Sequence, residues 1–162
     1  MKVAELGEKH KRTGQKRSLE VIRIFFEGIA CLSLARQTHK PNWRKTGEDA
    51  LENMSRWEDI SSRNFEHMAK LLQAEVHYLN GDLTSSDDSY KASIKAAREH
   101  KFIHYEALGY ELYGIFCIET KNVEKGMEKL QISVARYIEW GADRKVEDLR
   151  SFMELVKVAN PC

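Results

Sequence analysis

The sequence predicts an all-α fold built from antiparallel helix hairpins, and three observations lead to this fold class. Apolar residues recur in steps of three and four from about residue 20 onward, which is the spacing of one helix face. We see no stretch with the strict apolar–polar alternation of a half-buried strand. Only 2 prolines and 9 glycines occur among the 162 residues, so long helices are allowed and a loop-rich β fold is disfavoured.

The first segment, residues 1–17, is polar and basic, and we interpret it as an N-terminal tail or helix end. A nucleic-acid-binding arm is disfavoured because the segment offers no aromatic residue for base stacking. Ser18 is the expected N-cap of a long buried helix over residues 20–37. Its apolar run is too short for a membrane span and is interrupted by Arg23 and Glu27.

The next helix is predicted over residues 46–59. Pro41 should end the preceding helical region, because the residue before a proline avoids helical angles. A loop should then reach Lys45, and Thr46 should start the helix with a capping-box-like pattern.

Two more helices are expected between residues 61 and 100. The first should run over residues 61–79 and stop at Asn80-Gly81, since both residues tolerate left-handed backbone angles. The second should be capped by the Thr84-x-x-Asp87 pattern.

The segment 102–140 is predicted to be a hairpin with a turn at Lys121-Asn122. Gly114 and Gly126 lie where its two helices would cross, and the missing side chains let the backbones approach closely. Residues 141–143 should stop the second helix and cap a last one.

The hairpins repeat along the chain. The turns at Gly81-Asp82 and Lys121-Asn122 are 40 residues apart (121 − 81), and small and large residues alternate around both in the same order. Such alternation is what hairpins stacked side by side require. Gly28 and Gly47 match the small positions of an earlier repeat. The equivalent pairs are Ala74 and Gly114, Ser86 and Gly126, Tyr90 and Leu130, and Ser93 and Ser133.

This pattern resembles the tetratricopeptide repeat, in a divergent form that is longer than the family's usual period of about 34 residues. The resemblance covers residues 18–162. It implies antiparallel hairpins stacked in a right-handed superhelix, with a capping helix at the C-terminus.

The segment Ala135–Ala142, ARYIEWGA, followed by KVEDL at residues 145–149, carries a second resemblance. It is similar to the end of the helical repeat region in large multidomain signalling proteins. In that family an AAA-type ATPase, a serine/threonine kinase-like part and often a histidine kinase or cyclase surround the repeats. The resemblance carries over no catalytic residue, because we find no phosphate-binding loop and no kinase motif in this sequence.

Composition and spacing argue against several kinds of chemistry. The net charge of +1 gives no general attraction to nucleic acid or to membranes. The three cysteines form no CxxC pair, which disfavours a zinc site or a disulfide framework. His100 and His104 have a metal-ligand spacing, but a helix boundary near Lys101 should separate them. We therefore expect no catalytic residue, no metal and no cofactor.

We expect a non-catalytic scaffold that binds a protein or peptide on the face formed by the first helices of the hairpins. The glutamates of this face should favour a basic or neutral partner. Two alternatives stay open: a small helical enzyme that depends on a metal, and a face covered by neighbouring helices without any ligand. No secretory signal begins the sequence, so we expect a cytoplasmic location. The candidate partner-binding residues are Met68, Leu71, Glu75, Tyr78, Glu111, Ile115 and Glu119.

Overall fold

The computed structural model describes the backbone of residues 2–160 and the side chains of residues 19–160. Every regular element in the described chain is an α-helix, which confirms the all-α prediction. The helices are α1 (Lys2–Thr38), α2 (Pro41–Ile60), α3 (Ser62–Leu79), α4 (Leu83–Glu99), α5 (Ile103–Glu119), α6 (Val123–Trp140) and α7 (Asp143–Ala159).

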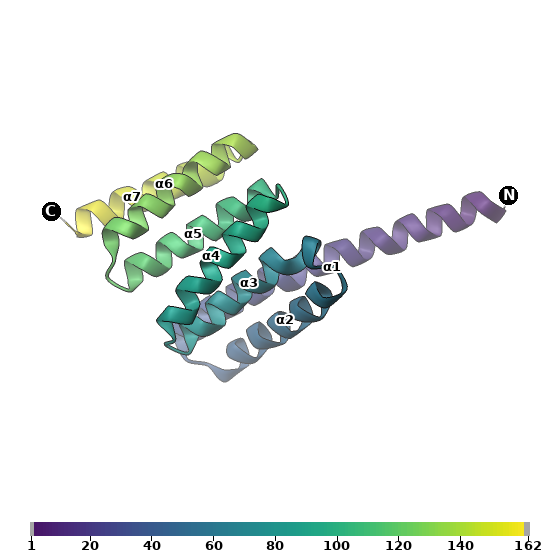
Figure 1. Ribbon diagram of the computed structural model, residues 1–162, viewed down its shortest axis with the longest axis horizontal. Helices are drawn as coiled ribbons and strands as arrows, with labels where there is room; N and C mark the ends of the chain where they lie inside the picture. Colours follow the sequence, from purple (N-terminus) through teal and green to yellow (C-terminus); the bar gives the residue numbers. More distant parts are fainter. Residues whose placement is uncertain (1, 161–162) are drawn as a thin grey trace.

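Consecutive helices pack side by side in an elongated array that runs from α1 and α2 to α7 (Figure 1). The N-terminal part of α1 extends beyond this array (Figure 1). The backbone of α3 packs against those of α1 and α5, whereas the backbones of α2, α4 and α6 pack only against the helices that adjoin them in the chain. We call the side of the molecule formed by α1, α3 and α5 the inner face.

The turns repeat the same backbone geometry every 20 residues. A residue with a left-handed φ angle ends each helix from α3 to α6, and two of these residues are not glycine. The side chains of Asp82 and Asn122 accept the backbone N–H groups of Ser85 and Lys125 and so cap α4 and α6. The left-handed residues are Gly81 (φ 78°), Lys101 (φ 62°), Lys121 (φ 69°) and Gly141 (φ 82°).

The predicted close approach of Gly114 and Gly126 is confirmed. A Cβ atom on Gly126 would lie 2.5 Å from Cγ1 of Ile118 and 2.7 Å from the carbonyl oxygen of Gly114. A Cβ atom on Gly114 would lie 2.7 Å from Cδ2 of Leu130. Helices α5 and α6 therefore meet at a distance that no larger residue allows.

Two buried serines form equivalent hydrogen bonds in successive hairpins. The hydroxyl group of Ser93 donates to the carbonyl oxygen of His67 at 2.7 Å, and that of Ser133 donates to the carbonyl oxygen of Ala107 at 2.8 Å. Both donors and both acceptors are 40 residues apart (133 − 93 and 107 − 67). The two hairpins α3–α4 and α5–α6 are thus built on one plan.

Two predicted helix starts are wrong. Helix α2 begins at Pro41, because a proline at the first helical position lacks only an N–H that would have no partner there. Thr46 lies inside this helix, where its hydroxyl donates to the carbonyl oxygen of Asn42. Helix α1 runs without a break through Ser18, so this residue is not an N-cap.

The cap of α4 also differs from the prediction. Asp82 occupies the N-cap position, and Asp87 lies one turn further on, paired with side chains of α4, α5 and α6. The cap predicted at Asp143 is absent: Ala142 is the N-cap residue and Asp143 is the first residue of α7.

The buried core consists of two clusters along the helix array. One cluster joins α1 to α5 around Phe25, Leu72 and Tyr90, and a second joins α5, α6 and α7 around Leu130 and Leu149. None of the described helices has an apolar stretch long enough to cross a lipid bilayer.

Candidate functional site

The seven predicted partner-binding residues separate by burial. The structure places three of them inside the core, three at partly covered positions and one at the surface. Of those inside the core, Leu71 and Glu75 are enclosed by contacts within the chain, whereas Met68, which is 5% exposed, lines a cavity. The buried residues are Met68, Leu71 and Glu75. The partly covered residues are Tyr78, Glu111 and Ile115, and the residue at the surface is Glu119.

Glu75 is the centre of a buried polar network. Its carboxylate is paired with the Arg36 guanidinium of α1 and accepts a hydrogen bond of 2.5 Å from the Tyr90 hydroxyl of α4. Only 1% of Glu75 is exposed. This carboxylate therefore joins α1, α3 and α4, and it corrects the expectation that Glu75 would be open to a partner.

The other two predicted glutamates are also paired within the chain. Glu119 accepts a hydrogen bond of 2.7 Å from the Tyr78 hydroxyl. Glu111 accepts hydrogen bonds from Tyr137 at 2.6 Å and from Lys145 at 2.7 Å, which joins α5 to α6 and α7. The charge of Glu111 is thus balanced by Lys145, which weakens the argument for a basic partner.

The other end of the inner face is apolar and hollowed. Two cavities of about 440 and 220 Å³ share His104 and Tyr105. Their rims carry large apolar side chains that are strongly exposed: Ile22 at 41%, Phe26 at 47% and Trp140 at 52%. We call this surface the aromatic groove, and its lining residues are Val21, Ile22, Phe26, Asn64, Phe65, His67, Met68, Phe102, His104, Tyr105, Leu108, Tyr137, Trp140 and Lys145.

His67 is the unusual residue of the aromatic groove. It is 1% exposed, and neither ring nitrogen has a hydrogen-bond partner in the described chain. Its ring packs 4.6 Å from the rings of both Phe102 and Tyr105. Burial, helped by the nearby His104 and His100, lowers the pKa of His67 to about 4, so the ring is neutral at pH 7.

The histidine pair singled out in the sequence is divided by a turn. His100 is the C-cap residue of α4, whereas His104 lies in α5 and stacks on Trp140 at 5.2 Å. Across the described residues, no three His, Cys, Asp or Glu side chains converge as metal ligands.

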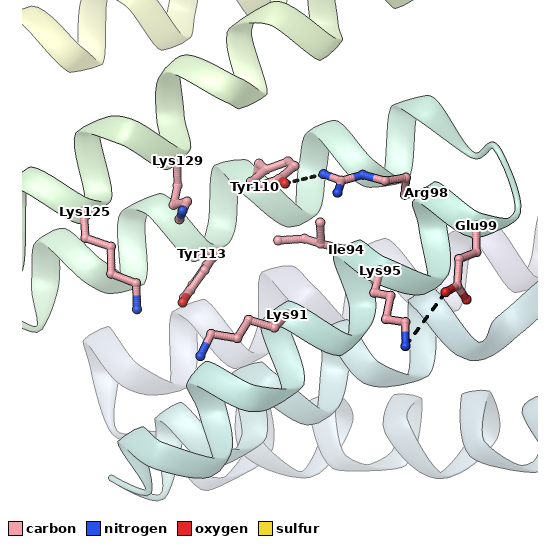
Figure 2. A pocket seen from close by; sticks show the side chains of 9 residues that line it. All are labelled: Lys91, Ile94, Lys95, Arg98, Glu99, Tyr110, Tyr113, Lys125 and Lys129. Carbon is pink, nitrogen blue, oxygen red and sulfur yellow. Dashed lines mark hydrogen bonds and ion pairs between the residues drawn. The ribbon is translucent and has the colours of Figure 1, made fainter.

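A second groove lies between α4, α5 and α6, away from the inner face (Figure 2). Its volume is about 470 Å³, and its lining includes five cationic side chains but only one carboxylate, Glu99. Ile94, Tyr110 and Tyr113 form its floor. We call it the cationic groove after Lys91, Lys95, Arg98, Lys125 and Lys129.

Asp87 holds one end of the cationic groove together. It accepts hydrogen bonds from the Tyr113 hydroxyl at 2.6 Å and from Lys125 at 2.7 Å, and it also pairs with Lys91. Burial opposes the charged form, but hydrogen bonds from Lys125, Lys91 and Tyr113 outweigh it and lower the pKa of Asp87 to about 2.

Sequence reasoning missed most of both grooves. Of the aromatic groove, the predicted partner-binding residues include only Met68, because the apolar run of α1 predicts a buried helix. The spacing of Ile22 and Phe26, four residues apart, was the available signal for an exposed apolar stripe. The spacing of Lys91, Lys95 and Arg98 was the corresponding signal for a cationic stripe on α4.

Comparison with known proteins leaves the family open. No family model matches the chain, and neither the curated proteins nor the solved structures contain a match to it. A functional assignment therefore depends on the repeat and on the chemistry of the two grooves.

Proposed function

We propose that this chain is a helical-repeat module that binds a segment of a partner protein in the aromatic groove and catalyses no reaction itself. The observation that carries the proposal is the exposure of Ile22, Phe26 and Trp140 around two adjoining cavities. Large apolar side chains gathered at one hollowed place are typical of a protein-binding surface.

The chemistry of the groove indicates which kind of segment it takes. Its walls are mainly apolar, Lys145 is paired with Glu111, and His67 at pH 7 is neutral, so the groove offers little to a charged side chain. Two cavities separated by His104 and Tyr105 suit two large apolar side chains of one segment. An amphipathic helix with anchors one turn apart presents such side chains.

The repeat supports a tetratricopeptide-like stack. The 40-residue period of turns and serine bonds, and the contacts of α3 with α1 and α5, support a stack of similar hairpins, for which we propose a right-handed superhelix. The first helices of such a stack line its concave side, which would be the inner face.

Helix α7 has the properties of a cap. Ala107 and Gly114 are the small residues through which α5 approaches α6, and the positions 40 residues later hold Glu147 and Glu154. Both glutamates are exposed. Two carboxylates at these positions disfavour the close packing of a further helix, and on this ground we propose that α7 ends the stack, although Leu155 and Val158 of the same helix are exposed.

We extend the proposal to the setting of the module. The resemblance of residues 135–149 to the end of a repeat region favours a cytoplasmic scaffold from a multidomain ATPase or kinase signalling protein, or a relative of one. An ATPase or kinase region in the same open reading frame would support this setting, and a flanking region of unrelated type would count against it.

Selection of peptides from a displayed random library tests the binding proposal. Peptides enriched on the protein should carry two large apolar residues, and they should bind the Phe26→Ser/Trp140→Ser variant about thirtyfold more weakly, as for a hot spot. The matched control is Ile138→Ser/Leu155→Ser, which removes two apolar side chains outside the groove that are 51% and 69% exposed. Equal binding to both variants, or peptides without apolar anchors, would refute the proposal.

A further inference from the structure

We propose that the cationic groove is a second docking site, which binds an extended acidic segment of a protein. Five cationic side chains and one carboxylate line a groove of about 470 Å³. An acidic ligand is the chemical complement of this lining. The site is separate from the aromatic groove and does not depend on the function proposed for it.

The spacing of the cations sets the length of the ligand. Lys91, Lys95 and Arg98 follow one face of α4, and seven residues of helix cover about 10 Å. Figure 2 shows Lys91 and Lys125 toward one end of the groove and Lys95 and Arg98 toward the other. An extended chain covers about 10 Å with three residues, so acidic side chains three positions apart reach both ends.

The partners of the cations show which of them can turn to a ligand. Lys91 and Lys125 are held by Asp87, and Arg98 donates to Glu106 at 2.9 Å. Lys95 lies 3.9 Å from Glu99.

Lys129 pairs at 2.8 Å with its chain neighbour Glu128; the lysine side chain is 19% exposed and the carboxylate 60%. The Lys95–Glu99 pair is exposed on both sides and contributes little, so Lys95 exchanges its carboxylate for that of a ligand at small cost. Lys129 can exchange an exposed partner, although its own stem is largely covered by the groove.

The groove suits a peptide better than a nucleic acid or a phosphate ion. Its cations are spread along the groove instead of converging on one point (Figure 2). Tyr113 is buried and Tyr110 is half-buried, so neither presents an open ring for base stacking. The floor around Ile94 and Tyr110 offers apolar contact to the residues between two acidic side chains.

Fluorescence anisotropy with a labelled peptide tests the site. The probe is a Gly/Ser peptide that contains one Glu-x-x-Glu unit, and its partner probe replaces both glutamates by glutamine. We expect binding of the glutamate peptide only, weakened as salt is raised from about 20 to 200 mM. The Lys95→Gln/Lys129→Gln variant should bind it about tenfold more weakly.

The matched control is Lys45→Gln/Lys157→Gln, which removes two exposed cations of α2 and α7 outside the groove. It should bind like the unmodified protein, and an equal loss in this control would overturn the proposal. Displacement of the peptide by tripolyphosphate or a short DNA strand at lower concentration than by unlabelled peptide would also overturn it. The Phe26→Ser/Trp140→Ser variant should retain acidic-peptide binding, so failure of either proposal is seen separately.

Discussion

The inner face and the cationic groove use charge in opposite ways. On the inner face, Glu75 is buried with Arg36 and Tyr90, while apolar side chains such as Phe26 are left exposed. In the cationic groove, the apolar floor around Ile94 is buried and the cations reach solvent. The comparison teaches that charge near the inner face holds helices together, whereas the cationic groove divides its charges. Lys91, Lys125 and Arg98 are paired within the chain, and Lys95 and Lys129 are the cations left to a ligand.

Burial explains the difference in energetic terms. A buried ion pair cannot lose one partner without leaving an uncompensated charge, which costs about 3–5 kcal/mol. An exposed pair is replaced by water and contributes about 0–1 kcal/mol. The following variants test whether the two surfaces divide in this way.

The largest change in unfolding free energy is expected for Arg36→Met. This change leaves the buried Glu75 carboxylate without its cation, so we expect a loss of about 3–5 kcal/mol in unfolding free energy. Urea denaturation followed by circular dichroism measures it. The matched control on the same helix is Arg23→Met, whose pair with Glu27 is exposed and whose loss should change stability by less than about 1 kcal/mol.

A double variant sharpens this result. Arg36→Met/Glu75→Met removes both charges and should be more stable than Arg36→Met alone, because no unpaired charge remains buried. If the two variants are equally unstable, packing of the Arg36 side chain on Tyr78 explains the loss, and the ion pair does not.

The second effect is the acid sensitivity of the aromatic groove. The unfolded chain protonates His67 near pH 6.5, whereas burial keeps the folded side chain neutral down to about pH 4. Between these values the unfolded state binds the additional proton, so stability falls with falling pH, by about 3 kcal/mol in total. The stabilising contribution is complete above pH 6.5.

Replacing His67 by leucine tests this assignment, because leucine has nearly the same size and does not titrate. Unfolding free energies at pH 7 and pH 4.5 should differ less in His67→Leu than in the unmodified protein. Asp87 titrates at lower pH, since its pKa is lowered to about 2, and its contribution is lost only as pH falls from about 4 toward 2. An unchanged slope between pH 7 and 4.5 would contradict the role of His67.

The sequence was sufficient for the helices because their signals are local. Apolar spacing, Asn80-Gly81 and Gly141 fix where helices run and stop, and the 40-residue period fixes which helices pair. Helix starts were less predictable. A proline disfavours helical angles in the residue before it and is also favoured at the first position of a helix, so Pro41 is compatible both with the end of one helix and with the start of the next.

The grooves depended on information that the sequence does not contain. Register placed Glu75 and Glu119 on the same face, but only the packing of Arg36 and Tyr90 against α3 determines that Glu75 is covered. Phe26 follows Phe25 in the chain, yet Phe26 is exposed and Phe25 is buried, where its ring meets that of Tyr105 from α5. Such contacts between distant segments have no local pattern.

The third effect concerns the base of the cationic groove. Gly126→Ala places a methyl group 2.5 Å from Ile118 and should cost about 1–3 kcal/mol, although alanine is the better helix former. It should also weaken binding of the acidic peptide, because Lys125 and Lys129 lie on the helix that is pushed away. The control Ala135→Gly, exposed on the same helix, measures helix propensity alone at about 1 kcal/mol.

The smallest effect completes the comparison. Lys95→Gln/Lys129→Gln should change the unfolding free energy by less than about 1 kcal/mol, since the Lys95–Glu99 pair is long and exposed and the Glu128 partner of Lys129 is itself exposed to water. The same variant should lose about tenfold in acidic-peptide affinity. The double lysine variant should therefore lose peptide binding and keep its stability. Arg36→Met on the inner face should lose stability, and this difference distinguishes the two surfaces. If this variant instead unfolds as readily as Arg36→Met, its cations are structural and the division between the two surfaces fails.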